Sequence, residues 1–181
     1  MEFVHLSIPD VILVKPRTFS DARGFFMETW EKKVFESEGI NLEFVQDNHS
    51  HSTKNVLRGM HYQIQHPQGK LIRAITGSIF DAVIDLRKES PTFGKWVGAI
   101  LNEENHYMLW IPPGFAHGFC VLSESTDFVY KETDYYTPEF ERSIIWNDPE
   151  VGIVWPDSLE SPILSPKDLN GKFLRDAEIF Y

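Results

Sequence analysis

Short apolar runs, separated by glycine, proline, asparagine or aspartate, follow one another through most of this chain. Several are rich in Val, Ile, Phe, Tyr and Trp, the residues that favour strands. The candidate strands are Val11–Lys15, Phe25–Thr29, Glu43–His49, Val56–Gln63, Lys70–Thr76, Ser78–Leu86, Lys95–Leu101, His106–Ile111, Gly118–Leu122 and Phe128–Thr133. Many short strands at close spacing predict an all-β sandwich or barrel, with a jelly roll as the natural candidate.

Helices and turns are marked at few places. Trp30–Gly39 has apolar residues at helical spacing and ends on glycine, and Ser165–Gly171 begins with a capping serine and a proline, so both predict short peripheral helices. Gly77 divides two strand-like runs and predicts a hairpin. Asn102–Asn105, with the sequence NEEN, predicts another turn.

Length and charge limit the classes of protein to consider. The chain has 181 residues, which suits a single domain spanning 1–181. Its net charge of −10 and the lack of a basic stripe argue against nucleic-acid binding. An acidic protein binds an anion only where cations gather locally, so any cluster of Arg, Lys and His is informative.

Cysteine content and hydropathy indicate the compartment. Cys120 is the single cysteine and lies in an apolar run, so we expect a buried thiol and no disulfide within the chain. The N-terminus lacks the basic region and long apolar run of a signal peptide. No stretch approaches the roughly 18 apolar residues of a membrane span. These features predict a cytoplasmic protein without membrane contact.

The stretch VLRGMHYQ, from Val56 to Gln63, carries polar side chains on a strand that is otherwise apolar. Arg58, His61 and Gln63, with Lys70 on the next predicted strand, indicate the lining of a pocket. A lone strand histidine is more often structural than catalytic. Strict alternation also puts Arg58 and His61 on opposite faces. Both line one cavity only if Gly59 marks a bulge or bend.

A second histidine, His117, follows a turn in the stretch IPPGFAHGF. The pattern Pro-x-Gly-x-x-His resembles the second signature of the cupin barrels, in which this histidine often helps to bind a metal. Those proteins usually carry His-x-His on an earlier strand, where this chain reads HYQ and Gln63 replaces the second histidine. His61 and His117 lack a clear third ligand, so we expect no metal site.

Other polar residues are ambiguous from the sequence. Asp168, in the stretch LSPKD, reads as a solvated carboxylate in the first turn of a short helix. Tyr130, Tyr135 and Tyr136 are either packing aromatics or hydrogen-bond donors and acids. Composition and spacing leave both alternatives open.

Long ordered motifs resemble one family over nearly the whole chain, from about Ile12 to Asp168. They read FSDARGFFMETW, FVQDNHSHSTKNVLRGMHYQ, PQGKLIRAITGSIFDAVIDLRKESPTFGKW, LWIPPGFAHGFCVLS and, near the end, WNDPEVGIVWP followed by LSPKD. The chain resembles the dTDP-4-dehydrorhamnose 3,5-epimerases, the cupin-fold enzymes of dTDP-L-rhamnose synthesis. The resemblance implies a jelly-roll cupin fold and a cofactor-independent isomerase. The implied reaction epimerises C3 and C5 of dTDP-4-dehydro-6-deoxy-D-glucose, giving dTDP-4-dehydro-L-rhamnose.

The resemblance also implies catalytic roles. His61 matches the base, Asp168 the carboxylate that orients it, Lys70 the group that stabilises the enolate oxygen, and Tyr130 the acid on the opposite face. The C4 ketone of the substrate acidifies its neighbouring C3 and C5 protons and supplies the electron sink. No metal or organic cofactor is therefore required in principle.

Further residues match the family's substrate pocket. Arg58 and His117 match residues that line the sugar and diphosphate site. The nucleotide end corresponds to Arg23, Phe26, Glu28, Gln46, Asn48 and Tyr136. In this family the N-terminal strands reach across a dimer, so the resemblance implies a homodimer whose hairpin residues serve the partner's site.

Three other functions compete with this interpretation. A monofunctional 3- or 5-epimerase of a related nucleotide-4-keto-sugar differs in the number of carbons that change. A metal-dependent cupin oxygenase predicts bound metal and loss of activity with a chelator. A non-catalytic cupin that binds sugar nucleotides predicts binding without exchange of substrate protons.

Overall fold

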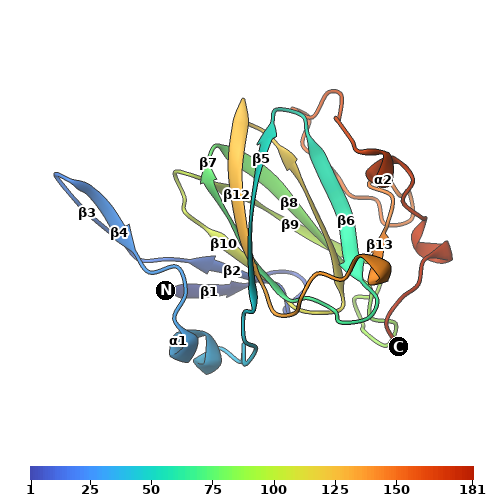
Figure 1. Ribbon diagram of the computed structural model, residues 1–181, viewed down its shortest axis with the longest axis horizontal. Coiled ribbons are helices and arrows are strands. Elements are labelled where there is room, and N and C mark those ends of the chain that lie inside the picture. Colours follow the sequence, from blue (N-terminus) through green and yellow to red (C-terminus); the bar gives the residue numbers. More distant parts are fainter.

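Two antiparallel sheets face each other in the computed structural model, which describes residues 1–181 (Figure 1). The six-stranded sheet has the order β1 (Glu2–His5), β2 (Ile12–Lys15), β10 (Met108–Ile111), β7 (Lys70–Thr76), β12 (Ser125–Glu132), β5 (Gln46–Thr53). The five-stranded sheet has the order β13 (Glu141–Ser143), β6 (Leu57–Gln63), β11 (Phe115–Val121), β8 (Ser78–Asp85), β9 (Trp96–Asn102). The predicted all-β, cupin-type jelly-roll sandwich is confirmed.

The core fills the space between the sheets because alternate residues of each strand point inward. Ile72 and Phe128 of the six-stranded sheet and Val83 and Phe119 of the five-stranded sheet belong to this buried cluster. Burying apolar surface at about 25 cal/mol per Å² is the main stabilising term for such a sandwich. Cys120 is fully buried and unpaired, as predicted.

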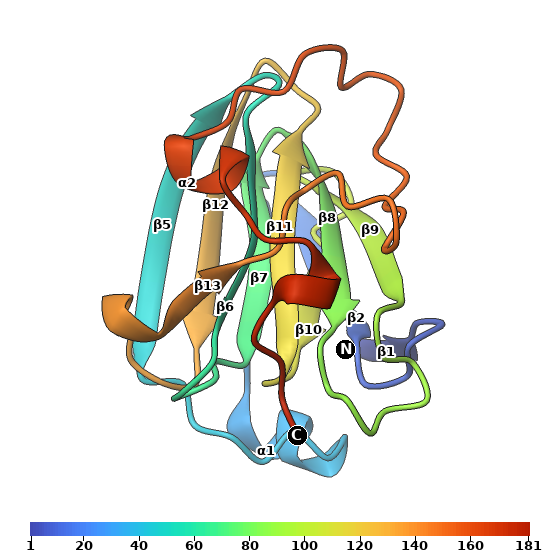
Figure 2. The same ribbon diagram turned by 90° about the vertical axis from the view of Figure 1, so that its right-hand side faces the viewer.

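Each sheet is also partly covered on its outer face. The short helix α1 (Lys32–Ser37) inserts Phe35 into a second apolar cluster over the six-stranded sheet. The C-terminal segment runs along the outside of the five-stranded sheet (Figure 2), where Leu174 and Phe180 pack beside Tyr62 of β6. The other helical turns are α2 (Pro166–Leu169), η1 (Pro138–Phe140) and η2 (Leu174–Asp176). Helix α1, the longest, has six residues, and no helix could cross a membrane.

A two-stranded hairpin projects from this body (Figure 1). It consists of β3 (Thr18–Asp21) and β4 (Gly24–Met27), which pair only with each other. Phe19, Phe25 and Phe26 are exposed large apolar side chains on this hairpin. Exposed apolar side chains grouped in this way are typical of interaction surfaces.

Each predicted strand corresponds to an observed one, but three short strands were not predicted and one connection is wrong. The strands without a prediction are β1, β3 and β13, which have three or four residues each. Both predicted helices and the turn after β9 are confirmed. The predicted hairpin at Gly77 is wrong, because β7 and β8 belong to different sheets. Gly77 has a φ of +70°, and an added Cβ would lie 2.1 Å from the Ser125 carbonyl oxygen, so glycine allows a tight crossing between the sheets.

Candidate active site

A cavity of about 620 Å³ opens between the two sheets. It is lined by every residue predicted for the site outside the N-terminal hairpin region, namely Gln46, Asn48, Arg58, His61, Lys70, His117, Tyr130, Tyr136 and Asp168. The six-stranded sheet contributes Lys70 and Tyr130, and the five-stranded sheet contributes His61 and His117. A ligand between the sheets therefore meets polar groups on both of its faces.

Gly59 allows Arg58 and His61 of β6 to face the same cavity, although strict strand alternation would put them on opposite faces. On β6 and β11, Arg58 pairs with Phe119 and His61 pairs with His117. The chain therefore advances three residues on β6 where it advances two on β11, and the register shifts between these pairs. The extra residue is a bulge, as the sequence analysis required, and both Arg58 and His61 line the cavity. Gly59 has a φ of +132°, and a Cβ there would lie 2.4 Å from the Cα of Gly118. Only glycine fits this close approach.

His61 and Asp168 form a hydrogen-bonded pair, although they are far apart in the sequence. The Nε2 atom of His61 lies 2.6 Å from Oδ1 of Asp168. Asp168 is 2% exposed and belongs to helix α2, whose N-cap Ser165 donates its hydroxyl to the other carboxylate oxygen at 2.7 Å. The backbone N–H of Gly59 also donates to Asp168, at 3.3 Å.

These donors determine the charge of the carboxyl group. Burial alone would raise the pKa of Asp168, but the hydrogen bonds from His61 and Ser165, the charge of His61 and the Gly59 N–H lower it to about 2. An ionised carboxylate only accepts hydrogen bonds, so Nε2 of His61 carries the proton. In the neutral imidazole, Nδ1 then holds the free lone pair and can accept a proton.

A second histidine and carboxylate lie beside the first pair. His117 is opposite His61 in the β6–β11 register, and its Nε2 atom lies 2.7 Å from Oδ2 of Asp81. Asp81 is fully buried on β8, and this burial raises the pKa of its carboxyl group although the nearby His117 lowers it. Nowhere in the structure do three His, Cys, Asp or Glu side chains gather as a group that could hold a metal ion.

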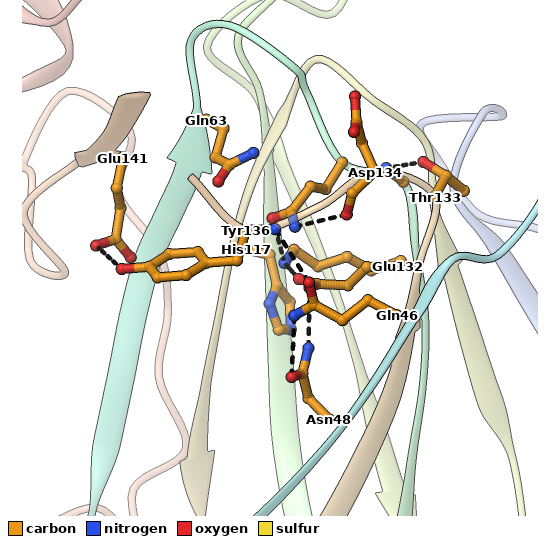
Figure 3. Close-up of polar contacts among 12 residues, drawn as sticks. Gln46, Asn48, Gln63, His117, Glu132, Thr133, Asp134, Tyr136 and Glu141 are labelled. Carbon is orange, nitrogen blue, oxygen red and sulfur yellow. Dashed lines mark hydrogen bonds and ion pairs between the residues drawn. The ribbon is translucent and has the colours of Figure 1, made fainter. Parts of the chain in front are cut away.

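Three neighbouring strands of the six-stranded sheet place Gln46, Glu132 and Lys70 in one row. Glu132 forms an ion pair with Lys70 and accepts a hydrogen bond from Nδ2 of Asn48 at 2.9 Å (Figure 3). The Lys70 ammonium also lies 5.4 Å from the centre of the Tyr130 ring. Sequence analysis missed Glu132, although it lies two residues after Tyr130 and strand alternation places both on one face.

The surroundings of Tyr130 raise the pKa of its phenol. Burial raises its pKa to about 12, and the negative charge of Glu132 adds to this effect, while Arg58 opposes it. The hydroxyl group therefore keeps its proton throughout the neutral and moderately alkaline range. It can donate that proton but does not serve as a base at neutral pH.

The rim of the cavity combines Gln46 and Tyr136, which were predicted for the site, with Glu141 and Lys167, which were not. Tyr136 donates its backbone N–H to Gln46 at 3.0 Å and its hydroxyl to Glu141 at 2.9 Å (Figure 3). Lys167 pairs with Glu141 at 2.6 Å. Gln63 contacts three backbone groups of the neighbouring loops, including Thr137 N–H at 2.6 Å, so its amide fixes loop structure.

The predicted nucleotide residues of the hairpin region lie outside this cavity within the single chain. Phe26 is 65% exposed on β4, and Arg23 in the β3–β4 turn pairs with Asp21 at 2.6 Å. Glu28 follows β4 and is also exposed. One chain therefore does not bring Arg23, Phe26 and Glu28 to the other predicted site residues.

Comparison with known proteins identifies a family of relatives. The family model described as dTDP-4-dehydrorhamnose 3,5-epimerase matches residues 5–176. The dTDP-4-dehydrorhamnose 3,5-epimerase of Pseudomonas aeruginosa is 55% identical over 181 residues, covering 99% of both chains. The Neisseria gonorrhoeae protein of the same name is 54% identical over 178 residues, which are 98% of this chain but 54% of that longer protein.

The fold has a close match among solved structures. The dTDP-6-deoxy-D-glucose-3,5-epimerase of Legionella pneumophila, solved in complex with dTDP-4-keto-L-rhamnose, superposes with a TM-score of 0.95 at 49% identity. The match covers 98% of this chain and 94% of that one. Sequence and fold thus agree on the same relatives.

Proposed function

The chain belongs to the dTDP-4-dehydrorhamnose 3,5-epimerase family, and we propose that it epimerises C3 and C5 of dTDP-4-dehydro-6-deoxy-D-glucose to give dTDP-4-dehydro-L-rhamnose. The observation that carries this proposal is that a histidine able to accept a proton and a phenol able to donate one lie on opposite walls of one cavity. His61, held by Asp168, belongs to the five-stranded sheet, and Tyr130 belongs to the six-stranded sheet. Inversion at carbon needs this arrangement, because the proton leaves one face and returns to the other.

The proposed reaction proceeds through an enolate. Nδ1 of His61 removes the proton from the carbon next to the C4 ketone, and the electron pair moves onto the ketone oxygen. Lys70 stabilises the negative charge that develops there. Tyr130 then donates its phenol proton to the opposite face of the same carbon, and the charge on oxygen collapses back to the ketone. The phenol recovers a proton from solvent and His61 releases one, so the enzyme returns to its starting state.

Asp168 supports the base without taking the proton itself. Its ionised carboxylate keeps the proton of the neutral imidazole on Nε2 and stabilises the imidazolium that forms on Nδ1 protonation. The hydrogen bond between His61 and Asp168 therefore becomes an ion pair as the reaction proceeds, which is the requirement for lowering a barrier rather than only binding substrate.

The anionic part of the substrate is assigned to hydrogen-bonding side chains that gather in the cavity of an otherwise acidic chain. Arg58 and His117 line the cavity beside His61 and are proposed to hold the sugar and diphosphate. Gln46, Asn48 and Tyr136 form the rim on the β5 side and are proposed to contact the nucleotide.

A homodimer completes the proposed site. Arg23, Phe26 and Glu28 belong to the projecting hairpin region and its exposed aromatic surface, so a second copy is proposed to receive them at its own cavity. The fully buried unpaired Cys120 and the net charge of −10 support the further expectation of a cytoplasmic enzyme that does not bind nucleic acid.

Deuterium exchange tests the proposal directly. The protein is incubated with dTDP-4-dehydro-6-deoxy-D-glucose in deuterium oxide, without added metal or cofactor and with a chelator in a parallel sample, and C3 and C5 are followed by NMR. We expect deuterium at both C3 and C5, and the exchange rate at each carbon should be the same with and without chelator. A reductase should convert the epimerised product to the L-rhamnose nucleotide. Label at one carbon would indicate a monofunctional epimerase, and loss of activity with chelator a metal-dependent enzyme.

Two variants sharpen the experiment. His61→Ala should lower the exchange rate by orders of magnitude in folded protein, because no other group replaces the base. His66→Ala is the matched control, since this histidine lies in an exposed loop outside the cavity. Exchange at wild-type rate in the His61 variant would remove His61 from the role of base. Binding without exchange in wild type would favour a non-catalytic sugar-nucleotide protein.

A further inference from the structure

Glu132 is a buried carboxylate inside a cavity that is proposed to bind an anion. It is 3% exposed, and it lies on the same face of β12 as Tyr130. A negative charge at this place repels a diphosphate sugar and loses its own hydration. A buried ion pair is also weak support for stability, because an apolar pair of similar volume is often as stable. The carboxylate therefore calls for an explanation in the chemistry of the cavity.

Both oxygens of Glu132 have a specific partner. Oε1 pairs with the ammonium of Lys70 on β7, and Oε2 accepts the hydrogen bond from Asn48 on β5. Asn48 in turn accepts from Gln46 at 3.1 Å, and Gln46 accepts the backbone N–H of Tyr136. Figure 3 shows this group of contacts from Glu132 to the rim. The cross-strand register places Glu132 directly between Gln46 and Lys70.

We propose that Glu132 is a positioning residue that holds the Lys70 ammonium in place for the enolate oxygen and connects it to the β5 residues Asn48 and Gln46. This inference rests on the proposed function, in which Lys70 stabilises the enolate. Lysine has a flexible four-carbon stem and loses rotamer entropy when it is fixed. Glu132 fixes it before the substrate arrives, and Gln68 adds a weaker contact at 3.4 Å.

The same carboxylate also favours the protonated form of the proposed acid. The charges that face Tyr130 are those of Glu132 and Glu141, which raise the pKa of its phenol beyond the effect of burial, and that of Arg58, which lowers it. The Lys70 ammonium lies near the ring as well. Burial is the larger of these effects, so Tyr130 stays protonated at neutral pH without Glu132, and the kinetic effect of Glu132 is expected to act through Lys70.

A double-mutant cycle tests whether Glu132 acts through Lys70. We compare wild type, Glu132→Gln, Lys70→Met and the double variant, measuring kcat, KM and deuterium exchange at C3 and C5. Glu132→Gln should lower kcat between tenfold and about a hundredfold, the loss expected for a misplaced catalytic group, and change KM by less than about twofold. In the Lys70→Met background the same change should have no further effect on exchange. Glu124→Gln, which removes the partner of exposed Lys54, is the matched control with unchanged kcat.

The outcomes separate this inference from the proposed function. Lack of exchange in wild type would overturn both. Exchange in wild type with unchanged kcat in Glu132→Gln would overturn the positioning role alone. Equal losses in both backgrounds, or a rise in KM without a fall in kcat, would also overturn it, because Glu132 would then act on the fold or on nucleotide binding. Should Glu132→Gln misfold by circular dichroism, Glu132→Ala, which leaves room for water beside the ammonium, is measured in the same cycle.

Discussion

Replacing Asp168 by asparagine removes one charge and keeps nearly the same shape beside His61. The wild-type carboxyl group has its pKa lowered from an ordinary 3.8 to about 2, against the opposing effect of burial. At 1.36 kcal/mol per pKa unit, this net difference corresponds to about 2.5 kcal/mol in favour of the ionised form. That net value combines the contacts of Asp168 with His61, Ser165 and Gly59 against burial, and it sets the order of magnitude of the interaction that His61 loses in Asp168→Asn.

The expected result is a loss of rate rather than of binding. The imidazolium forms only during proton abstraction, so the missing charge affects the transition state more than the substrate complex. A loss of about 2.5 kcal/mol lowers kcat roughly 50- to 100-fold, and the wrong tautomer of His61 increases the loss further. Steady-state kinetics with a coupled reductase gives kcat and KM, and the deuterium-exchange rate reports proton abstraction itself.

The same substitution has a signature in acid stability. Because the folded pKa of Asp168 is depressed, its contribution to the free energy of unfolding is complete above about pH 4 and is lost as the pH falls toward 2. Urea unfolding of Asp168→Asn should therefore depend less on pH within that window.

Asp85→Asn is the matched control for this pair of measurements. Burial opposes the shift at Asp85 too, but hydrogen bonds from Arg87, Ser90 and Thr92 lower its pKa to about 2 as well. Asp85→Asn should also make the free energy of unfolding depend less on pH between about 4 and 2. It should leave kcat unchanged, because Asp85 lies outside the cavity. A folded Asp168→Asn enzyme with kcat within about threefold of wild type would refute the argument for the His61–Asp168 pair.

Three other changes test separate parts of the structure. Tyr130→Phe should reduce turnover by roughly 10²- to 10⁴-fold and release partly epimerised product, as seen by NMR; unchanged rates and products would assign the acid role to another group. Gly59→Ala should lower the free energy of unfolding by more than about 2 kcal/mol and abolish exchange, because its Cβ meets Gly118 at a φ that disfavours side chains; a stable, active variant in urea unfolding would contradict the bulge argument. Burial raises the pKa of the Cys120 thiol to about 12, so iodoacetamide at pH 8 should label it only after unfolding; rapid labelling of native protein, seen by mass spectrometry, would show that the thiol is accessible.

Local patterns in the sequence predicted the strands because each strand is chosen by side chains within a few residues. Lys70–Thr76 was predicted with its observed bounds, and Ser165 was recognised as the cap of a helix. The partners of a strand depend on contacts that are distant in the chain. For this reason Gly77 was assigned to a hairpin, although the chain there crosses from one sheet to the other.

The candidate site shows the same division. Arg58, His61 and Lys70 stood out because polar side chains are rare on apolar strands. The pairing of His61 with Asp168 came from family resemblance, since no local pattern relates residues so far apart. Glu132 was open to prediction from its two-residue spacing to Tyr130, but only the register of β5, β12 and β7 reveals its contacts with Asn48 and Lys70.

The proposed base, His61, and the proposed acid, Tyr130, belong to different sheets, so the packing between the sheets affects the distance between them. Phe119 and Phe128 come from opposite sheets, pack with ring centres 4.5 Å apart and also line the cavity. They act as spacers, since the gap between the layers sets how far His61 stands from Tyr130. Under the proposed mechanism, residues that transfer no proton therefore help to set the geometry of proton transfer.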